Sequence, residues 1–354
     1  MAPAEVAIIG AGPVGCALAL DLHRCGRRVR LCARPGNHAA TPALRPIALS
    51  HASRLILERL DAWGALRPTP IGTIHVSQAG RFGRTRIGAA DAGVPALGYV
   101  LDYDELTRAL LGQVRARGID LAAEVPEAAL RVHAEGVARE ATGKDYRQVA
   151  LVARIETDPP AAGTAYERFT REGPLALLPL DRQYATVWAM APERATVLAA
   201  TDEATFLAEL GAAFGRRAGR FVAAGTRARF PLALRVRASR TGEREVFLGN
   251  AAQTLHPVAG QGLNLGLRDA WDLARLLQDA RDPGEARLLA RFAATRRLDA
   301  VATIRVTDLL AGAFTGDGAL PAAARGAAMT ALDACAPARR FFARRMIFGI
   351  SAIP

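Results

Sequence analysis

The order of apolar and polar positions at the start of the chain predicts a strand, a helix and a second strand. Residues 6–9 form a short apolar run with β-branched side chains, which is typical of a buried parallel strand. A glycine-rich turn follows, and residues 16–22 are almost entirely apolar, as expected for a buried helix. Residues 29–32 form the second apolar run. Together these elements predict a βαβ unit.

The turn between the first strand and the helix has the spacing Gly-x-Gly-x-x-Gly. Gly10 permits the tight turn, Gly12 lets the backbone approach a pyrophosphate, and Gly15 lets the helix pack closely on the strand. The N–H groups and the dipole at the helix N-terminus favour an anion there. We therefore expect a dinucleotide site at this turn. The carboxylate that often binds the ribose after the second strand is replaced by Ala33 and Arg34.

The middle of the chain shows a different pattern, in which apolar and polar positions alternate as in strands with one buried face. Strands with this alternation are expected at residues 146–155, 165–171 and 184–189. Residues 71–87 suggest a hairpin that turns at residues 78–80, and a helix is expected from Asp202 to Gly215. An antiparallel sheet of this kind offers one wide apolar face, which suits an aromatic ring with an apolar tail.

A second glycine-rich unit lies far downstream, over residues 245–266. An apolar strand ends at Gly249 and Asn250, and a loop rich in glycine and proline leads into a helix that begins near Leu263. Apolar residues recur at helical spacing as far as Leu277, so this helix has one buried face. The loop and the helix N-terminus present N–H groups to a polar or anionic group.

Charge and composition argue against a nucleic-acid-binding protein, a disulfide-bonded protein and a metalloprotein. The chain of 354 residues carries 46 Lys and Arg against 34 Asp and Glu, a net charge of +12, and Lys144 is its one lysine. Aromatic residues do not interleave with the basic ones, which argues against a nucleic-acid partner. The four cysteines and six histidines lack metal-binding spacing, so we expect neither disulfides nor a metal site. Without a secretory signal or an apolar run of roughly 18 residues, a cytoplasmic protein is expected.

The segments that carry most information are the first glycine turn, Arg45–Leu49, Thr73–Ser77, Glu167–Thr170, Gly173–Pro179 and Gly249–Ala270. Together they resemble the FAD-dependent aromatic hydroxylases of ubiquinone biosynthesis, which are class A flavoprotein monooxygenases. Asn250 and Gln253 select this group, because most related flavoproteins carry aspartate and histidine at the two positions.

The resemblance implies an α/β fold, in which a Rossmann-like FAD-binding domain carries an inserted antiparallel β-sheet substrate domain and C-terminal helices. The expected boundaries are residues 1–70, 102–144 and 236–296 for the FAD-binding domain, 71–101 and 145–235 for the substrate domain, and 297–354 for the helical region. The alanine-rich segment 118–135 shows little strand pattern, so the FAD-binding domain is expected to be shortened there.

The resemblance also implies which residues hold FAD. Arg45 would lie across the phosphate and ribityl region, and Asn250 would bind a ribityl hydroxyl. The full expected set is Gly10, Gly12, Gly15, Arg45, Glu135, Gly136, Gly249, Asn250, Pro257, Gly260, Gly262, Leu263 and Asn264, of which the last five would frame the isoalloxazine ring. His256 is expected to anchor the loop, and no catalytic base is implied.

The implied activity is hydroxylation of the ring of a polyprenylated phenol of the 2-octaprenyl-6-methoxyphenol type. NAD(P)H would reduce FAD transiently, and oxygen from O2 would be transferred through a C4a-hydroperoxyflavin. One alternative is a degenerate, non-catalytic homologue that acts as a scaffold for other ubiquinone-biosynthesis proteins. A flavin halogenase is disfavoured, because Lys144 is the one lysine and the three tryptophans are isolated in sequence.

The C-terminal segment 336–350 repeats arginine pairs and apolar pairs at near-helical spacing. One interpretation is an interfacial helix that contacts the inner face of the cytoplasmic membrane, where a substrate with a long prenyl tail would reside. The other is a helix docked on the protein, with Phe341 and Phe348 in the core.

Overall fold

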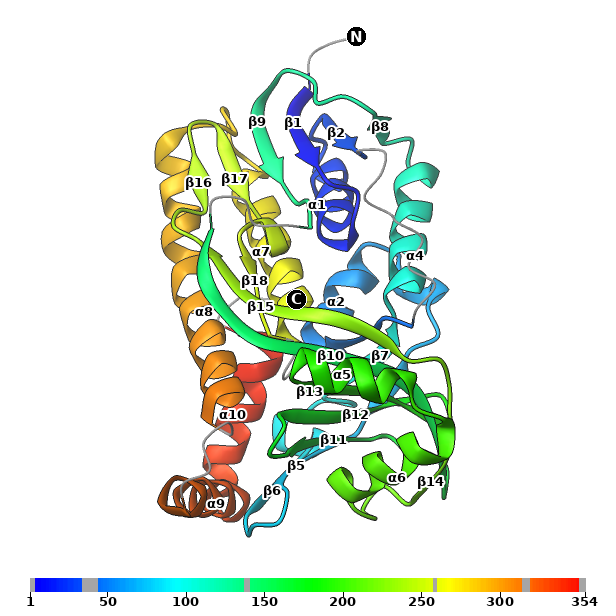
Figure 1. The fold of residues 1–354 in the computed structure, drawn as a ribbon. Coiled ribbons are helices and arrows are strands. Elements are labelled where there is room, and N and C mark those ends of the chain that lie inside the picture. The colour runs from blue at the N-terminus through cyan, green and yellow to red at the C-terminus, as the bar shows by residue number, and fades with distance from the viewer. Residues whose placement is uncertain (1–3, 34–43, 137–140, 257–259, 314–318, 350–354) are drawn as a thin grey trace.

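The structure is a computed structural model that describes residues 4–33, 44–136, 141–256, 260–313 and 319–349. The described part is elongated (Figure 1). A mostly parallel sheet with its helices forms one end, and a large, mostly antiparallel sheet forms the other. A small antiparallel sheet packs between helix α7 and strand β12 of the large sheet.

The parallel sheet has the strand order β16-β17-β9-β1-β2-β8, and each neighbouring pair from β17 to β8 is parallel. Its strands are β1 (Ala4–Ile9), β2 (Val29–Cys32), β8 (Asp120–Ala122), β9 (Ala128–His133), β16 (Thr241–Gly242) and β17 (Glu245–Phe247). The central strand β1 is buried on both faces, since Val6, Ala7 and Ile8 have no solvent exposure. The expected βαβ unit is present as β1, α1 (Pro13–Arg24) and β2.

Three helices cover this sheet and form its core. They are α1, α4 (Tyr103–Ala116) and α7 (Gln261–Leu277). Leu18, Leu110 and Leu273 contribute one fully buried side chain from each helix to a single apolar cluster. Helix α7 begins two residues before the expected start at Leu263, at the end of the downstream glycine-rich loop.

Residues 118–135 contain two strands, β8 and β9, although the sequence of this segment shows little strand pattern. Strand β9 pairs with β1, and two of its residues, Leu130 and Val132, are fully buried. Strand β8 pairs with β2 at the sheet edge, where Arg30 Nε lies 2.6 Å from the Asp120 carboxylate directly opposite. These strands are specified by pairing with distant segments, so their own composition gives little signal.

The large sheet has the strand order β18-β15-β10-β13-β12-β11-β5-β6, with β14 also paired to β10. Its strands are β5 (Thr73–Gln78), β6 (Arg84–Gly88), β10 (Ala141–Asp158), β11 (Thr164–Phe169), β12 (Pro174–Leu180), β13 (Gln183–Met190), β14 (Arg220–Ala224), β15 (Ala228–Arg237) and β18 (Gln253–Thr254). The expected hairpin and strands are present, and β5 pairs with β11 in parallel. Strands β10, β15 and β18 take residues from segments that were assigned to the FAD-binding domain.

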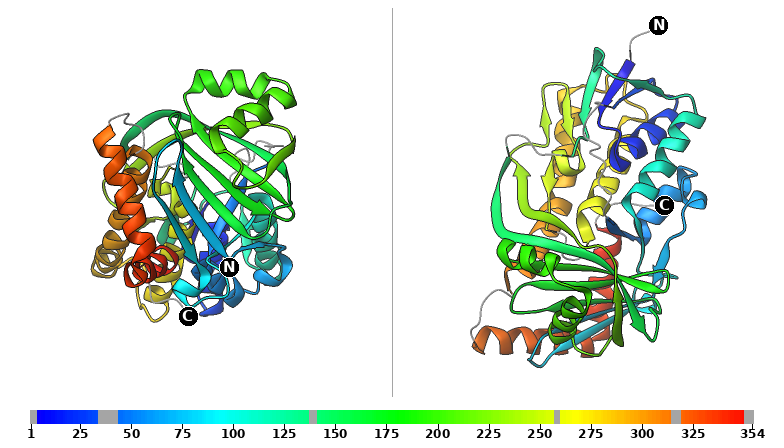
Figure 2. Two further views of the ribbon diagram at one scale, coloured as in Figure 1. Left: turned by 90° about the horizontal axis from the view of Figure 1, so that it is seen from below. Right: turned by 45° about the vertical axis from the view of Figure 1, so that its right-hand side comes forward.

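The two faces of the large sheet have different neighbours. Helices α5 (Pro192–Ala200) and α6 (Glu203–Phe214) cover the outer face, where Trp188 and Phe206 belong to one buried cluster (Figure 2). Helix α6 matches the expected helix, and the Asp202 carboxylate caps it by accepting from Thr205 N at 2.9 Å. The inner face is turned toward the middle of the molecule.

The remaining elements connect the sheets and cover their edges. They are β3 (Pro46–Ser50), β4 (Thr69–Ile71) and β7 (Gly98–Asp102) of the small sheet, the short helices α2 (His51–Arg59), η1 (Trp63–Ala65), α3 (Ala89–Ala92) and η2 (Gly249–Ala251), and the C-terminal helices α8 (Ala286–Ala313), α9 (Ala319–Ala334) and α10 (Ala336–Phe348). Helix α9 lies beside the β5–β6 hairpin (Figure 2). None of the helices in the described part of the chain combines the length and apolarity that crossing a bilayer requires.

Candidate active site

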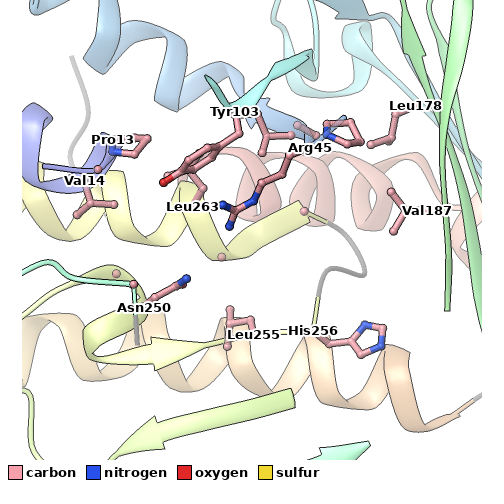
Figure 3. A pocket seen from close by; sticks show the side chains of 18 of the residues that line it. Pro13, Val14, Arg45, Tyr103, Leu178, Val187, Asn250, Leu255, His256 and Leu263 are labelled. Atoms are coloured by element: carbon pink, nitrogen blue, oxygen red, sulfur yellow. The ribbon is translucent and has the colours of Figure 1, made fainter. Parts of the chain in front are cut away.

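A cavity of about 730 Å³ lies where the three sheets meet. It is lined by the first glycine turn, the start of α4, the inner face of the large sheet, and residues from the segments 249–256 and 260–263 (Figure 3). The structure brings most of the expected FAD residues together there: Gly10, Gly12, Arg45, Glu135, Gly136, Gly249, Asn250, Gly260, Gly262 and Leu263. Pro257 lies outside the described residues.

The three glycines of the first turn have different roles. Gly10 has φ +114°, and a Cβ there would lie 2.7 Å from the backbone of Ala134. A Cβ on Gly15 would lie 1.9 Å from the Gly10 carbonyl oxygen, so α1 approaches the turn closely. A Cβ on Gly12 would meet only the Tyr103 hydroxyl, at 3.4 Å. Gly10 and Gly15 therefore permit the fold, whereas Gly12 keeps cavity space open.

Two helix N-termini border the cavity. Helix α1 begins after Gly12, and α7 begins after Gly260, which has φ +59°. Neither end has a side-chain cap hydrogen bond or an acidic residue in its first turn. Their backbone N–H groups and helix dipoles therefore favour a ligand with negative charge or acceptor atoms. Gly262 leaves the start of α7 uncovered, because a Cβ there would meet no atom within 4 Å.

Arg45 projects into the cavity between these helix ends (Figure 3). Its guanidinium carbon lies 4.1 Å above the centre of the Tyr103 ring, a cation–π contact that fixes its direction. Tyr103 N donates to the Arg45 carbonyl oxygen at 3.0 Å, so the two residues are held together by backbone and side chain. Burial raises the pKa of Tyr103, although the nearby arginine opposes this shift. Tyr103 had no signal in the sequence beyond its place after the helix cap Asp102.

Asn264 lies behind the cavity wall rather than in its lining. The side chain is 2% exposed, and its oxygen accepts from Ser50 N and Ser53 Oγ, both at 2.7 Å. Its amide nitrogen donates to the carbonyl oxygens of Ala48 and Gly260 at 2.8 and 2.7 Å. Asn264 thus ties the start of α7 to β3, the strand that follows Arg45. Gly15 also lies outside the lining, against the Gly10 backbone.

The end of β9 supplies Glu135 and Gly136 to the cavity. The neighbouring His133 ring stacks on Phe247 with centroids 4.6 Å apart, and its Nδ1 lies 3.5 Å from Glu135 Oε2. Ala33, at the end of β2, lines the cavity where a carboxylate was considered. Among the described residues at this edge of the parallel sheet, the charged side chain that lines the cavity is that of Glu135, which follows β9.

The inner face of the large sheet forms an apolar wall of the cavity. The residues of this wall are Ile74, Ala165, Pro174, Ala176, Leu178, Val187 and Ala189. Glu167 stands among them, a lining residue that is absent from the expected FAD set. His256 closes one side; it is 1% exposed, and its ring packs edge-on against Tyr146 at 5.0 Å, which fits an anchoring role.

These residues fit FAD. Glycines leave open faces beside two uncapped helix ends, and no carboxylate among the described residues pairs with the Arg45 guanidinium, so it can meet an anion. The apolar wall stands opposite and suits an aromatic substrate. In the part of the chain that the structure describes, no three His, Cys, Asp or Glu side chains gather as metal ligands.

Comparison with known proteins decides the family. A profile of the FAD binding domain matches residues 129–307, half of the chain. The ubiquinone hydroxylase UbiL of Rhodospirillum rubrum is 31% identical over 96% of this chain and 89% of its own length. The chain belongs to the FAD-dependent hydroxylase family of ubiquinone biosynthesis. It is therefore an FAD-dependent aromatic-ring monooxygenase, and NAD(P)H is the reductant typical of this family.

A second relative supports the family, and a solved structure supports the fold. The 3-demethoxyubiquinol 3-hydroxylase of Escherichia coli is 30% identical over 80% of this chain and 82% of its own length. The crystal structure of p-nitrophenol 4-monooxygenase PnpA from Pseudomonas putida DLL-E4 superimposes with a TM-score of 0.77 at 15% identity, covering 99% of each chain. At that identity the superposition shows the fold alone, the α/β architecture described above.

Proposed function

We propose that this monooxygenase hydroxylates the aromatic ring of a polyprenylated phenol of the 2-octaprenyl-6-methoxyphenol type, with NAD(P)H and O2 as co-substrates. The observation that carries the proposal is the apolar wall of the large sheet, which faces the glycine turn and both helix ends across one cavity. Such a wall can cover an aromatic ring and the start of a prenyl tail. Reduced FAD, when bound, supplies the activated oxygen.

We further propose how the chain holds FAD within this function. Gly10 and Gly12 would cradle the pyrophosphate at the start of α1, and Arg45 would hold phosphate or ribityl oxygens with its fixed fork. Asn250 would bind a ribityl hydroxyl. The start of α7 would face the isoalloxazine ring, where its N–H groups stabilise negative charge on the reduced ring.

A panel of phenols tests the substrate class. FAD-loaded protein is incubated in detergent micelles with NADPH, air and 2-methoxyphenols that carry no tail, a short prenyl tail or an octaprenyl tail. We expect ring hydroxylation with kcat/KM rising from the tailless to the tailed phenols, since each added isoprene unit buries more apolar surface. Equal turnover of all phenols would contradict the prenyl-phenol assignment, as would hydroxylation of the tailless phenol alone.

A peripheral contact with the membrane is proposed through α10. The helix docks on the protein through Ala343 and Ile347, which are both 3% exposed, while Phe341 points outward and is 74% exposed. Arg340 beside it is also exposed. The docked interpretation is wrong for Phe341, which is exposed, whereas Phe348 packs partly buried against the cluster of Ala343 and Ile347. The outer face of α10 presents an aromatic ring next to a cation, as an anionic lipid surface favours.

A point variant tests this contact without removing the docked helix. Phe341→Ser should weaken co-sedimentation with phosphatidylglycerol vesicles by roughly tenfold, because a large apolar side chain no longer enters the interface. Leu298→Ser is the control, since Leu298 is 69% exposed on α8. Equal binding of the Phe341 variant and the unmodified protein, or no binding by either, would remove α10 from a membrane role.

A further inference from the structure

Glu167 is a carboxyl group placed in the apolar wall of the cavity. It lies on β11, where Ala165 shares its face and Ala176 is its register partner on β12; all three line the cavity. The next residue, Arg168, points to the opposite face, where its Nε donates to the Ala213 carbonyl oxygen of α6 at 3.2 Å. The alternation of strand side chains therefore directs Glu167 toward the space between sheet and glycine turn.

The carboxyl group has no partner in the described protein. Its Oε1 is fully buried and receives no hydrogen bond from any described residue. The side chains around it in the wall are apolar, among them Ile74 and Val187. Burial raises the pKa of Glu167 to about 8. A buried polar atom without a partner is costly and uncommon, and in a cavity it indicates a site whose partner is a ligand.

We propose that Glu167 receives the ring hydroxyl of the phenol substrate and accepts its proton when the ring is hydroxylated. This rests on the proposed function. In this step the phenol O–H bond breaks, its electron pair stays on the phenol oxygen, and the proton forms a bond to a Glu167 carboxylate oxygen. The electron density gained by the ring makes it more reactive toward activated oxygen. Glu167 returns the proton to the same oxygen of the product.

The surroundings of Glu167 suit this proton transfer. A glutamate in water is a weak base toward a phenol, whereas a carboxyl group whose pKa lies near neutrality can exchange a proton with it at working pH. The apolar neighbours offer Glu167 no competing hydrogen-bond partner, and a low local dielectric strengthens a hydrogen bond to the phenol. Among the described residues of the large sheet that line the cavity, Glu167 is the one that carries a carboxyl group.

Infrared spectroscopy tests the protonation of Glu167 without relying on turnover. FAD-loaded protein should show the carbonyl band of a protonated carboxyl group that disappears with a midpoint near pH 8. Adding 2-methoxyphenol should lower this midpoint, since a hydrogen bond from the hydroxyl favours the carboxylate. Glu167→Gln should lack the band, and Glu156→Gln, an exposed glutamate on β10, should retain it. Absence of the band, or a midpoint that the phenol does not move, overturns the proposal.

Kinetics of the same variants test the proton transfer itself. The kcat/KM of the unmodified protein should rise with pH to a plateau above about 8, as a base must be ionised to act. Glu167→Gln should be about 100- to 10 000-fold slower, without this pH dependence. The variant should fold as well as the unmodified protein, because glutamine has nearly the same shape and no described residue pairs with the carboxyl group. An unchanged kcat/KM and an unchanged pH profile in Glu167→Gln would refute the role of Glu167 while leaving the proposed function intact.

A different outcome would refute the proposed function, namely that the unmodified protein hydroxylates no phenol. In that case the shift of the infrared midpoint by 2-methoxyphenol still tests whether Glu167 binds the phenol hydroxyl.

Discussion

Gly12→Val should yield a folded protein that no longer retains FAD. A Cβ at this position would meet only the Tyr103 hydroxyl, at 3.4 Å, so we expect the fold to tolerate the substitution. Its methyl groups would instead occupy the cavity in front of α1, where the pyrophosphate must approach the backbone. We expect affinity for FAD to fall by more than about tenfold, or 1.4 kcal/mol. Flavin absorbance per chain after purification and after reconstitution measures the loss.

The control for this variant is Gly15→Val in the same turn. A Cβ on Gly15 would lie 1.9 Å from the Gly10 carbonyl oxygen, so this substitution should destabilise or prevent folding itself. Circular dichroism and thermal unfolding distinguish the two effects. A folded Gly12→Val protein with its full complement of FAD would show that the pyrophosphate does not lie at this turn.

Arg296→Met should destabilise the protein by about 3–5 kcal/mol. Arg296 is fully buried on α8 and lies 2.7 Å from both Asp269 and Asp299, and 2.6 Å from Asp272. Burial lowers the pKa of Arg296, but the charges of Asp269 and Asp299 have a larger effect and raise this pKa above its ordinary value. Methionine of similar length would leave buried carboxylates without their main cation. Denaturant unfolding measures the free energy of unfolding. A loss below about 1 kcal/mol would contradict a stabilising role for the ion pairs of Arg296.

The pH dependence and a surface control sharpen this test. Burial raises the pKa of Asp269, but Arg240 and Arg296 outweigh that effect and hold it below the ordinary value. Its ion pairs therefore stabilise the native protein above pH 4, and this contribution is lost as the pH falls further. Without Arg296 the carboxylates should protonate more readily, so the deficit should shrink toward pH 4. Arg297→Met, on the exposed side of α8, should change stability by no more than about 0.5 kcal/mol.

Local sequence patterns predicted the parts of the site that short segments form by themselves. The spacing of Gly10, Gly12 and Gly15 specifies a strand–turn–helix junction, and the structure contains it. The downstream turn at Gly249 has a positive φ of 54°, a local conformation that suits glycine. In both segments the backbone conformation follows from a few neighbouring residues.

Other site residues depend on partners far away in the chain. Asn264 was expected to frame the flavin ring, but its hydrogen bonds to Ser50 and Ser53 connect residues more than 200 positions apart. Glu167 and Tyr103 enter the cavity only because the large sheet and α4 are packed beside the glycine turn. Such placements follow from tertiary packing, which the alternation of apolar and polar residues does not encode.

The measurement that tests the FAD-dependent hydroxylation most directly uses isotopic oxygen. FAD-loaded protein, NADPH and 2-octaprenyl-6-methoxyphenol in micelles are incubated under ¹⁸O2, and the product is analysed by mass spectrometry. We predict a ring-hydroxylated phenol that carries one ¹⁸O atom per molecule, in amounts that depend on added FAD and fall with Gly12→Val. Oxidation of NADPH without a hydroxylated product would contradict FAD-dependent hydroxylation by this protein. A product whose new oxygen comes from water would contradict it as well.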